Sequence, residues 1–433
     1  GKRFGFFPAV SLGWVISEEK FFPKNNIVKY LKVRGSYGEV GNDQIGGDRF
    51  LYLPSSYGAA SDSGVNKYNF GLASNPYTSL MIVENKIGNP DLTWEKAKKM
   101  NVGVDINLFN NCLTASFDIF KEKRNNILAN RSTSPMIIGA NLPAYNFGEM
   151  ENRGWEMDLN FRHHIQDFHY WARFNYSFAR NEIIYMDEVQ KRYDYQMTTG
   201  RRKNQFFGLI FDGYYNSWEE INALDRPKSS WSGNQLQPGD VKYVDVNQDG
   251  VIDDYDMVPI GYTPVPEIIY GFSFGAQYKG FDFSILFQGA DNVSIKYFGR
   301  SMWPFAKGEE SAKSLIKERW TQERYEAGEK ITFPRLSLNP NGETDHNYRP
   351  STLWIRDASY LRLKNLEVGY TFTGGFVKRL NLNSVRLYFN GSNLFTWTDV
   401  VDLDPEAPSR SGNVEINTYP LQKVYNIGLN INF

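Results

Sequence analysis

Apolar and polar residues alternate with a period of two along most of this 433-residue chain. In the stretch "GWEMDLNF", Trp155, Met157 and Leu159 fall on one side, and Glu156 and Asp158 fall on the other. A period of two places successive side chains on opposite faces of a β-strand. The alternation recurs in "VSLGWVI", "LKVRGSY", "NVGVDINL", "LTASFDIF", "YWARFNYSFA", "IYGFSFGAQY", "FDFSILFQG", "LRLKNLEVGYTF", "SVRLYFNGSN" and "YNIGLNINF". The sequence therefore predicts an all-β fold of antiparallel strands, each with one apolar face.

The alternation changes phase within "LRLKNLEVGYTF", between Leu363 and Leu366. One extra residue in one strand of an antiparallel pair produces this shift and leaves both flanks on the same sheet. We therefore predict a β-bulge at this point.

The connections between the strands alternate between short and long. Tight turns follow "NLFN", "FRHHIQ" and "AQYKG", and modest turns span residues 17–28 and 374–383. Long connections span residues 43–91, 127–148, 182–266, 293–353 and 397–420. Short turns on one rim and long loops on the other are typical of an outer-membrane β-barrel, whose long loops face outside. For the rims to stay consistent, the aromatic segment "NQFFGLIFDGYYNS" must belong to the long extracellular loop 182–266 and not cross the membrane.

The strand count indicates an incomplete barrel. We count about 11 crossings, whereas bacterial single-chain barrels have an even number of strands. An open sheet in lipid leaves two rows of unpaired backbone groups, each costing several kcal/mol. We therefore expect residues 1–433 to be the C-terminal portion of an antiparallel transmembrane β-barrel of about 22 strands, with the N-terminal strands outside this sequence. The last strand, which ends at Phe433, has the terminal aromatic residue typical of such barrels.

Composition narrows the class of protein. Aromatic residues make up 16% of the chain, which favours strands. The 48 basic and 49 acidic residues are balanced, which argues against a nucleic-acid-binding surface. The chain lacks an apolar run of about 20 residues, so we predict no transmembrane helix, and the mean hydropathy of -0.50 is compatible with alternating barrel strands. The lone Cys112 cannot form an internal disulfide.

One stretch of the long loop, "DVNQDGVIDDYD", has the spacing of a calcium-binding loop. Gly250 occupies the sixth position, where the chain turns sharply, and Ile252 would pack the loop onto its support. An acidic, solvated turn is the alternative. Pro and Gly residues flank the motif in place of helices, so we expect a structural Ca²⁺ clamp and not an EF-hand switch; Mg²⁺ suits the site less well because it resists dehydration. The predicted ligands are the side chains of Asp245, Asn247, Asp249, Asp253 and Asp256 and the carbonyl of Val251.

Other candidate residues carry weaker signals. His163, His164 and His169 surround a predicted tight turn, where solvated side chains are a better interpretation than a metal site. We find no acid, base and nucleophile motif, and therefore predict a protein that is not an enzyme. Aromatic residues in the external loops could stack on a ligand, although packing between loops or an interfacial girdle is the alternative. These residues are Tyr214, Tyr215, Trp231, Trp303 and Trp397.

Taken together, several stretches resemble the SusC/RagA-type TonB-dependent outer-membrane importers of Bacteroidetes-like Gram-negative bacteria. The resemblance rests on "FGFFPAVSLGWVISEEKFF", "LKVRGSYGEVGN", "NPDLTWEKAKKMNVGVD", "NRGWEMDLNF", "GDVKYVDVNQDGVIDDYD", "YKGFDFSILFQG", "ASYLRLKNLEVGYTF" and "VRLYFNGSNLFTWTD". These stretches span nearly the whole chain, in the order of the family's C-terminal barrel.

The resemblance implies a function and partners. It implies a plugged 22-stranded barrel in the outer membrane that imports nutrients such as oligosaccharides or peptides, with the plug domain outside the present sequence. A SusD-like surface lipoprotein would act as a lid, and the TonB complex would drive import through the N-terminal region. The competing hypothesis is a calcium-stabilised surface protein or adhesin, built of soluble β-sandwiches, that transports nothing. The sequence leaves the nutrient itself unidentified.

Overall fold

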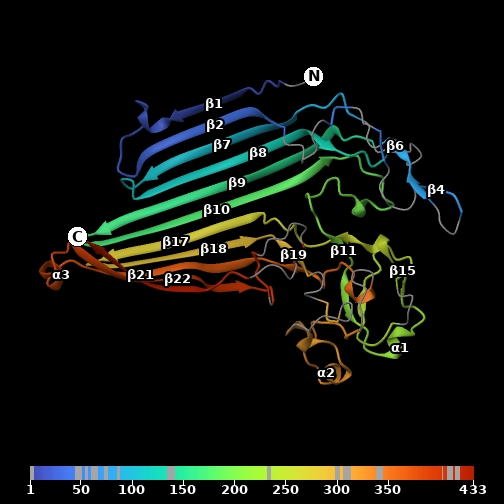
Figure 1. The fold of residues 1–433 in the computed structure, drawn as a ribbon. Helices are drawn as coiled ribbons and strands as arrows, with labels where there is room; N and C mark the ends of the chain where they lie inside the picture. The colour runs from blue at the N-terminus through green and yellow to red at the C-terminus, as the bar shows by residue number, and fades with distance from the viewer. Residues whose placement is uncertain are drawn as a thin grey trace.

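The fold is given by a computed structural model of the chain (Figure 1). The structure describes residues 4–43, 51–53, 57–59, 67–72, 77–84, 88–133, 142–231, 236–297, 303–305, 314–337, 345–401, 403–406, 413–414 and 420–433. All statements below concern these residues.

A single antiparallel sheet of 11 strands dominates the structure and confirms the predicted fold class and strand number. Neighbours in the sheet are also neighbours along the chain apart from the intervening loops, and the strands lie side by side from β1 to β24 in Figure 1. The sheet is not closed, because β1 and β24 form its two edges. In order, the strands are β1 (Ala9–Val15), β2 (Val28–Asn42), β7 (Glu95–Leu108), β8 (Leu113–Ala129), β9 (Tyr145–Ile165), β10 (Phe168–Tyr185), β17 (Ile268–Tyr278), β18 (Phe281–Asp291), β21 (Tyr360–Phe372), β22 (Ser384–Thr398) and β24 (Val424–Asn432).

The predicted alternation of short and long connections is confirmed. Only two residues separate β17 from β18, and both Lys279 (φ 45°) and Gly280 (φ 93°) adopt positive φ, as a two-residue hairpin turn requires. The modest turns carry η1 (Ile16–Glu18) and α3 (Phe376–Arg379). The long connections leave the opposite end of the sheet, where the loop elements gather in Figure 1.

The two faces of the sheet differ in polarity. Paired residues on neighbouring strands share a face, and one such row across β7, β8, β9, β10 and β17 is made of Val104, Phe117, Met157, Tyr176 and Tyr270. This row lies on the apolar face, which we call the outward face. Large apolar residues of this face are exposed at the surface, for example Leu12 (78% exposed) and Ile427 (80% exposed). The inward face carries polar and charged side chains. This division matches a barrel wall with lipid outside and a polar interior.

The charges of the inward face are paired with each other. The Arg34 guanidinium lies between two carboxylates, with its Nε 3.1 Å from Asp105 Oδ2 and its Nη1 2.6 Å from Asp118 Oδ1. Toward the β24 edge of the sheet, the Arg386 guanidinium contacts Asp282 at 2.7 Å and also contacts Glu367. These ion pairs link the side chains of neighbouring strands across the inward face of the sheet.

The predicted β-bulge is confirmed at Lys364. Leu286 pairs with Asn365 and Phe287 pairs with Leu363, so Lys364 has no partner in the β18–β21 ladder. The β21–β22 ladder shifts at the same place. The bulge keeps Leu363 and Leu366 on the outward face, as the phase change in the sequence indicated.

The long loops form a separate body with its own apolar core. It contains α1 (Trp218–Ile221), α2 (Gln322–Glu326), η3 (Asp194–Gln196), η4 (Asp254–Asp256), η6 (Ser314–Glu318) and η8 (His346–Tyr348). Its small sheets pair β11 (Phe207–Gly208) with β16 (Val258–Pro259), β12 (Phe211–Tyr214) with β14 (Val241–Tyr243), β13 (Lys228–Ser229) with β15 (Val251–Ile252), and β19 (Ser294–Tyr297) with β20 (Ile355–Asp357) and β23 (Asn413–Val414). The connection between β2 and β7 contributes no described residue to this core and carries two further pairs, β3 (Tyr57–Ala59) with β6 (Ile82–Glu84) and β4 (Lys67–Phe70) with β5 (Tyr77–Leu80). The segment "NQFFGLIFDGYYNS" therefore lies in the loop body, as predicted. Among the described helices, none has the length and apolarity needed to cross a membrane.

Candidate functional site

The calcium-like loop lies on the surface of the loop body. Gly250 has φ +81° and Gln248 has φ +59°, so the chain makes the predicted sharp turn. Ile252 is 3% exposed and packs into the core of the loop body, which confirms the prediction that it packs the turn onto its support. The motif lies between β14 and β16, and the flanking segments contain no amphipathic helix within the described residues 236–297. This loop therefore lacks the helix pair of an EF-hand switch.

The side chains of the motif bond mainly to backbone amides of the same loop. Asp256 is fully buried and accepts hydrogen bonds from Val246 N and Asp253 N, both at 2.8 Å. Asp245 Oδ2 accepts from Gly250 N at 2.8 Å, while its Oδ1 is buried and has no hydrogen-bond partner among the described residues. Burial, together with the negative charge of Asp245, raises the pKa of Asp256 above its ordinary value despite these amide bonds. The donor chemistry and the turn fit a hard cation.

The geometry of the carboxylates is less complete than the spacing predicted. Among the residues that the structure describes, no group of three or more His, Cys, Asp or Glu side chains is placed to hold a metal ion. The Asn247 and Asp249 side chains contact each other at 3.1 Å, between Nδ2 and Oδ2. Calcium binding at this loop therefore stays a prediction.

The predicted aromatic ligand residues of the loop body are largely packed inside it. Tyr214, Tyr215 and Trp303 are each 6–8% exposed, and two of them belong to the main loop core. Trp231 is partly buried, and the Arg349 guanidinium lies 4.2 Å from the centre of its ring. A ring that stacks on a ligand needs an open face, so in this structure these four side chains pack the loops together.

A polar cluster that sequence reasoning missed joins two of the long loops. Asp240, from the loop before β17, is 3% exposed and accepts a 2.7 Å hydrogen bond from Asn347 Nδ2. Arg335 Nε lies 2.6 Å from the same carboxylate. Next to it, His346 Nε2 donates to Val241 O at 2.8 Å, and its Nδ1 lies 3.0 Å from Ser229 Oγ. Burial lowers the pKa of His346, which favours the neutral ring. The lone external histidine is therefore a bridge between loops.

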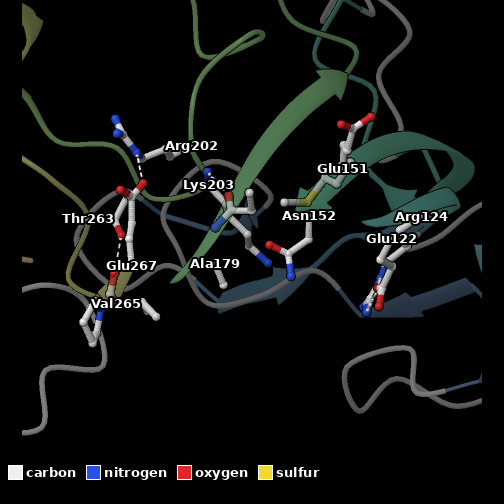
Figure 2. Close-up of a pocket in the computed structure, with 13 residues that line it drawn as sticks. Glu122, Arg124, Glu151, Asn152, Ala179, Arg202, Lys203, Thr263, Val265 and Glu267 are labelled. Atoms are coloured by element: carbon white, nitrogen blue, oxygen red, sulfur yellow. Dashed lines mark hydrogen bonds and ion pairs between the residues drawn. The ribbon is translucent and has the colours of Figure 1, made fainter. Parts of the chain in front are cut away.

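A cavity of about 340 Å³ opens on the inward face of the sheet, where β8, β9 and β10 meet the loop body. Figure 2 shows the side chains that line it. The strands contribute Glu122, Arg124, Asn152, Ala179 and Asn181, and the loops contribute Arg202, Lys203, Thr263, Val265 and Glu267, among others. The cavity therefore lies at the loop end of the sheet, between the strand ends and the loops; we call this region the mouth of the barrel.

The carboxylates of this cavity are each held by cations. Glu267 is 5% exposed and accepts hydrogen bonds from Arg180, at 2.8 and 2.9 Å. It also accepts a hydrogen bond from Arg202 (Figure 2). Burial alone would raise the pKa of Glu267, but these hydrogen bonds outweigh it and hold the pKa below its ordinary value. Glu122 lies 2.7 Å from the Arg124 guanidinium and is also paired with a lysine. These carboxylates are therefore neutralised, and the lining also contains amide and ammonium side chains that can donate hydrogen bonds to a polar molecule.

Comparison with known proteins places this wall in a family. The family model described as "TonB dependent receptor-like, beta-barrel" matches residues 2–394. The chain belongs to this family. TonB-dependent receptor P3 of Formosa agariphila is 27% identical over 450 residues, which cover 100% of this chain and 42% of the relative. TonB-dependent receptor SusC of Bacteroides thetaiotaomicron is 27% identical over 437 residues, with coverages of 100% and 40%.

A solved structure shares the fold of this receptor barrel. The RagAB peptide transporter superposes with a TM-score of 0.71 at 24% identity, over 99% of this chain and 43% of that chain. The predicted resemblance to SusC/RagA-type receptors is thus confirmed, as is the location in the Gram-negative outer membrane. The chain spans about two-fifths of the length of the curated relatives that it matches.

Within this receptor barrel, the predicted position of Trp397 is wrong. The sequence placed it in a long external loop, whereas the structure places it in β22, which continues to Thr398. Trp397 pairs with Leu361, is 54% exposed and lies 6.3 Å from Phe395, ring centre to ring centre, on the outward face. An outward tryptophan at the loop end of a barrel strand belongs to the interfacial girdle. Its ring faces lipid and not the interior.

The histidines at the opposite rim of the receptor barrel lie as predicted around a tight turn. His163 and His164 lie near the end of β9 and His169 near the start of β10, and all three are exposed. The rings of His164 and His169 stack across the strands at 5.4 Å.

Proposed function

We propose that this chain forms part of the barrel of an active importer that takes up nutrients too large for passive pores, of the oligosaccharide or peptide class. The observation that carries the proposal is the open 11-stranded wall, whose loop end has a polar cavity facing inward. Membership of the receptor family supports an active importer over a static pore. The similarity of this chain to TonB-dependent receptor SusC and to the RagAB peptide transporter supports a nutrient of this class.

The proposed mechanism needs partners outside this chain. A SusD-like surface lipoprotein would close over the loop body and trap the nutrient against the mouth. The TonB complex, acting on the part of the receptor that couples to energy, would then open a path through the barrel. In this scheme the protein moves its substrate and breaks no bond. The polar side chains of the mouth, such as Asn152, Asn181 and Lys203, would bind the nutrient before it enters.

Uptake measurements in cells test this proposal. We expect deletion of the full gene to abolish uptake of a labelled oligosaccharide or oligopeptide set, and the restored gene to recover it. A protonophore should stop this uptake, because TonB uses the proton gradient. Uptake that persists with the protonophore would show a passive pore and contradict the proposal. Recovery of the protein in the soluble fraction without detergent would instead favour the adhesin hypothesis, which the continuous sheet already disfavours.

We also propose that Ca²⁺ binds at Asp245, Asn247, Asp249, Asp253 and Asp256 and at the carbonyl of Val251, and that it fixes the loop between β10 and β17. The unpartnered, buried Asp245 Oδ1 supports this proposal, since an oxygen of this kind lacks the donor that burial requires. A cation would supply that partner and neutralise the acidic groups. Ordering a loop costs about 1–2 kcal/mol per residue, so a clamp at its centre would lower its rate of local opening.

Limited proteolysis of the full-length receptor tests the calcium clamp. We expect chelation to speed cleavage between β10 and β17 by about tenfold or more, because each ordered residue contributes about 1–2 kcal/mol. The Asp249→Ala, Asp253→Ala double variant should be cleaved at the fast rate with or without calcium. Asp254→Ala, at a position that supplies no ligand, is the matched control and should behave as wild type. Equal wild-type rates with and without chelator would rule out the clamp.

A further inference from the structure

A second cavity, on the outward face, is strongly basic. It encloses about 410 Å³ where β9 and β10 leave the sheet and meet the loop body. Its lining contains four arginines, Arg153, Arg180, Arg201 and Arg202, and one acidic residue, Glu182. Asn181 and Arg202 also line the inward cavity, but none of the functions proposed above uses Arg153 or Arg201.

The strands place the cavity directly beyond the apolar band. Arg153 pairs with Arg180 in the β9–β10 register, and two residues toward the short-turn rim Trp155 pairs with Phe178. Residues two apart on a strand share a face, so the arginines point outward with these rings. The Trp155 and Tyr176 rings stack at 4.7 Å, and the Arg180 guanidinium lies 5.4 Å from the centre of the Phe178 ring. An outward aromatic cluster of this kind marks the membrane interface, on the side of the long loops.

The loop body adds the other two arginines through backbone pairing with β10. Gly200 N donates to Ile183 O at 2.7 Å, and Ile183 N donates to Arg201 O at 2.8 Å. Lys203 N donates to Asn181 Oδ1 at 2.7 Å. This segment thus occupies the edge of β10 beyond the start of β17. The cavity is therefore built by backbone structure and not by a chance meeting of long side chains.

The positive charge of the cavity is only partly compensated. Arg180 and Arg202 share the Glu267 carboxylate. Arg153 lies 3.9 Å from Glu182 in a pair whose side chains are 60% and 42% exposed. Arg201 donates through Nε to Met197 O at 3.3 Å, and within the described residues its terminal nitrogens make no ion pair. Among the residues that the structure describes, four guanidinium groups thus face two carboxylates, and the Arg153 and Arg201 guanidinium groups keep free donors.

We propose that this cavity binds the phosphate group of an outer-leaflet lipid, of the phosphorylated glycolipid class found in Gram-negative outer membranes. Guanidinium groups bind phosphate oxygens through paired, charge-assisted hydrogen bonds, and basic pockets at the membrane surface bind lipid head groups. The adjacent apolar band would contact the acyl chains of the same lipid. The proposal rests on the outer-membrane location and not on import, so it can fail or succeed independently of the transport proposal.

Lipid binding to the purified full-length receptor in detergent tests the proposal. The probes are bisphosphorylated lipid A, its dephosphorylated form, and glucosamine 1-phosphate as a soluble phosphate, each measured by native mass spectrometry. The test variant is Arg153→Gln with Arg201→Gln, which leaves the Arg180 and Arg202 contacts with Glu267 intact. Lys123→Gln is the matched control, because Lys123 is outward and paired with Glu149 at 2.9 Å but does not line the cavity.

We expect the receptor to bind bisphosphorylated lipid A at least about tenfold more tightly than the dephosphorylated form, since each charge-assisted hydrogen bond contributes about 1.5–3 kcal/mol. The double variant should lose this preference, and the control should keep it. Equal binding of both lipid forms would overturn the proposal, as would an unchanged preference in the double variant. Tighter binding of glucosamine 1-phosphate than of lipid A would assign the cavity to a soluble anion and would also overturn it.

Discussion

Replacing Arg362 with alanine is expected to release residues 403–406 from the inner face of the wall. Arg362 is 2% exposed and contacts Asp404 Oδ1 and Glu406 Oε2, both at 2.7 Å. Burial opposes the ionisation of Asp404, but the hydrogen bonds from Arg362 and from the backbone of Leu421 and Glu406 outweigh it and lower its pKa. Without the guanidinium, two carboxylates remain close together and uncompensated. Breaking a buried ion pair in this way costs about 3–5 kcal/mol.

Hydrogen exchange of the full-length receptor in detergent checks this result. The amide of Leu421, which donates to Asp404 Oδ2 at 2.9 Å, should exchange about a hundredfold faster or more in Arg362→Ala. A triple variant that adds Asp404→Asn and Glu406→Gln removes the stranded charges and should recover most of the protection. Lys364→Gln is the matched control, since Lys364 contacts Glu406 only at 3.4 Å and is more exposed. Unchanged exchange in Arg362→Ala would show that the segment is held by apolar contacts.

The sheet could be predicted because each strand carries its own pattern. Every outward residue of β9, from Trp155 to Phe161, is apolar, so the period of two is visible without knowledge of the neighbouring strands. The bulge at Lys364 was visible for the same reason, since an extra residue changes the parity of the pattern. Because the face toward lipid must be apolar, each strand carries the alternation in its own sequence. Local sequence is therefore enough to predict most of the sheet.

The loop body could not be predicted in the same way. Asp240 and Asn347 are 107 residues apart in sequence, and nothing near either residue indicates that their side chains meet. The arginines of the outward cavity were missed because Arg201 reaches β9 and β10 only through loop backbone pairing. Trp397 was misplaced because aromatic residues are common both in loops and at strand ends. The spacing of "DVNQDGVIDDYD" indicated the turn and its anchor Ile252, but not how the carboxylates lie.

The second large effect is the destabilisation that we expect from Phe174→Arg, a substitution on the lipid-facing side of the sheet. Phe174 lies midway along the apolar positions of β10, opposite Leu159 and Phe272, and faces outward. An arginine at the midplane of the lipid face costs about 2–4 kcal/mol, because its charge leaves water for hydrocarbon. We therefore expect less folded receptor in the outer-membrane fraction and a lower urea midpoint for the protein in lipid vesicles.

Asn175→Arg is the matched control for this prediction, because it adds the same side chain one residue further along the same strand. Asn175 faces inward and pairs with Asp158, so a new guanidinium there stays in a polar environment beside a carboxylate. We expect its urea midpoint and its membrane yield to stay near the wild-type values. An equal loss in both variants would mean that β10 tolerates no large side chain on either face. A loss in Asn175→Arg alone would reverse the assignment of the two faces, and the apolar face would then have to line the interior of the barrel.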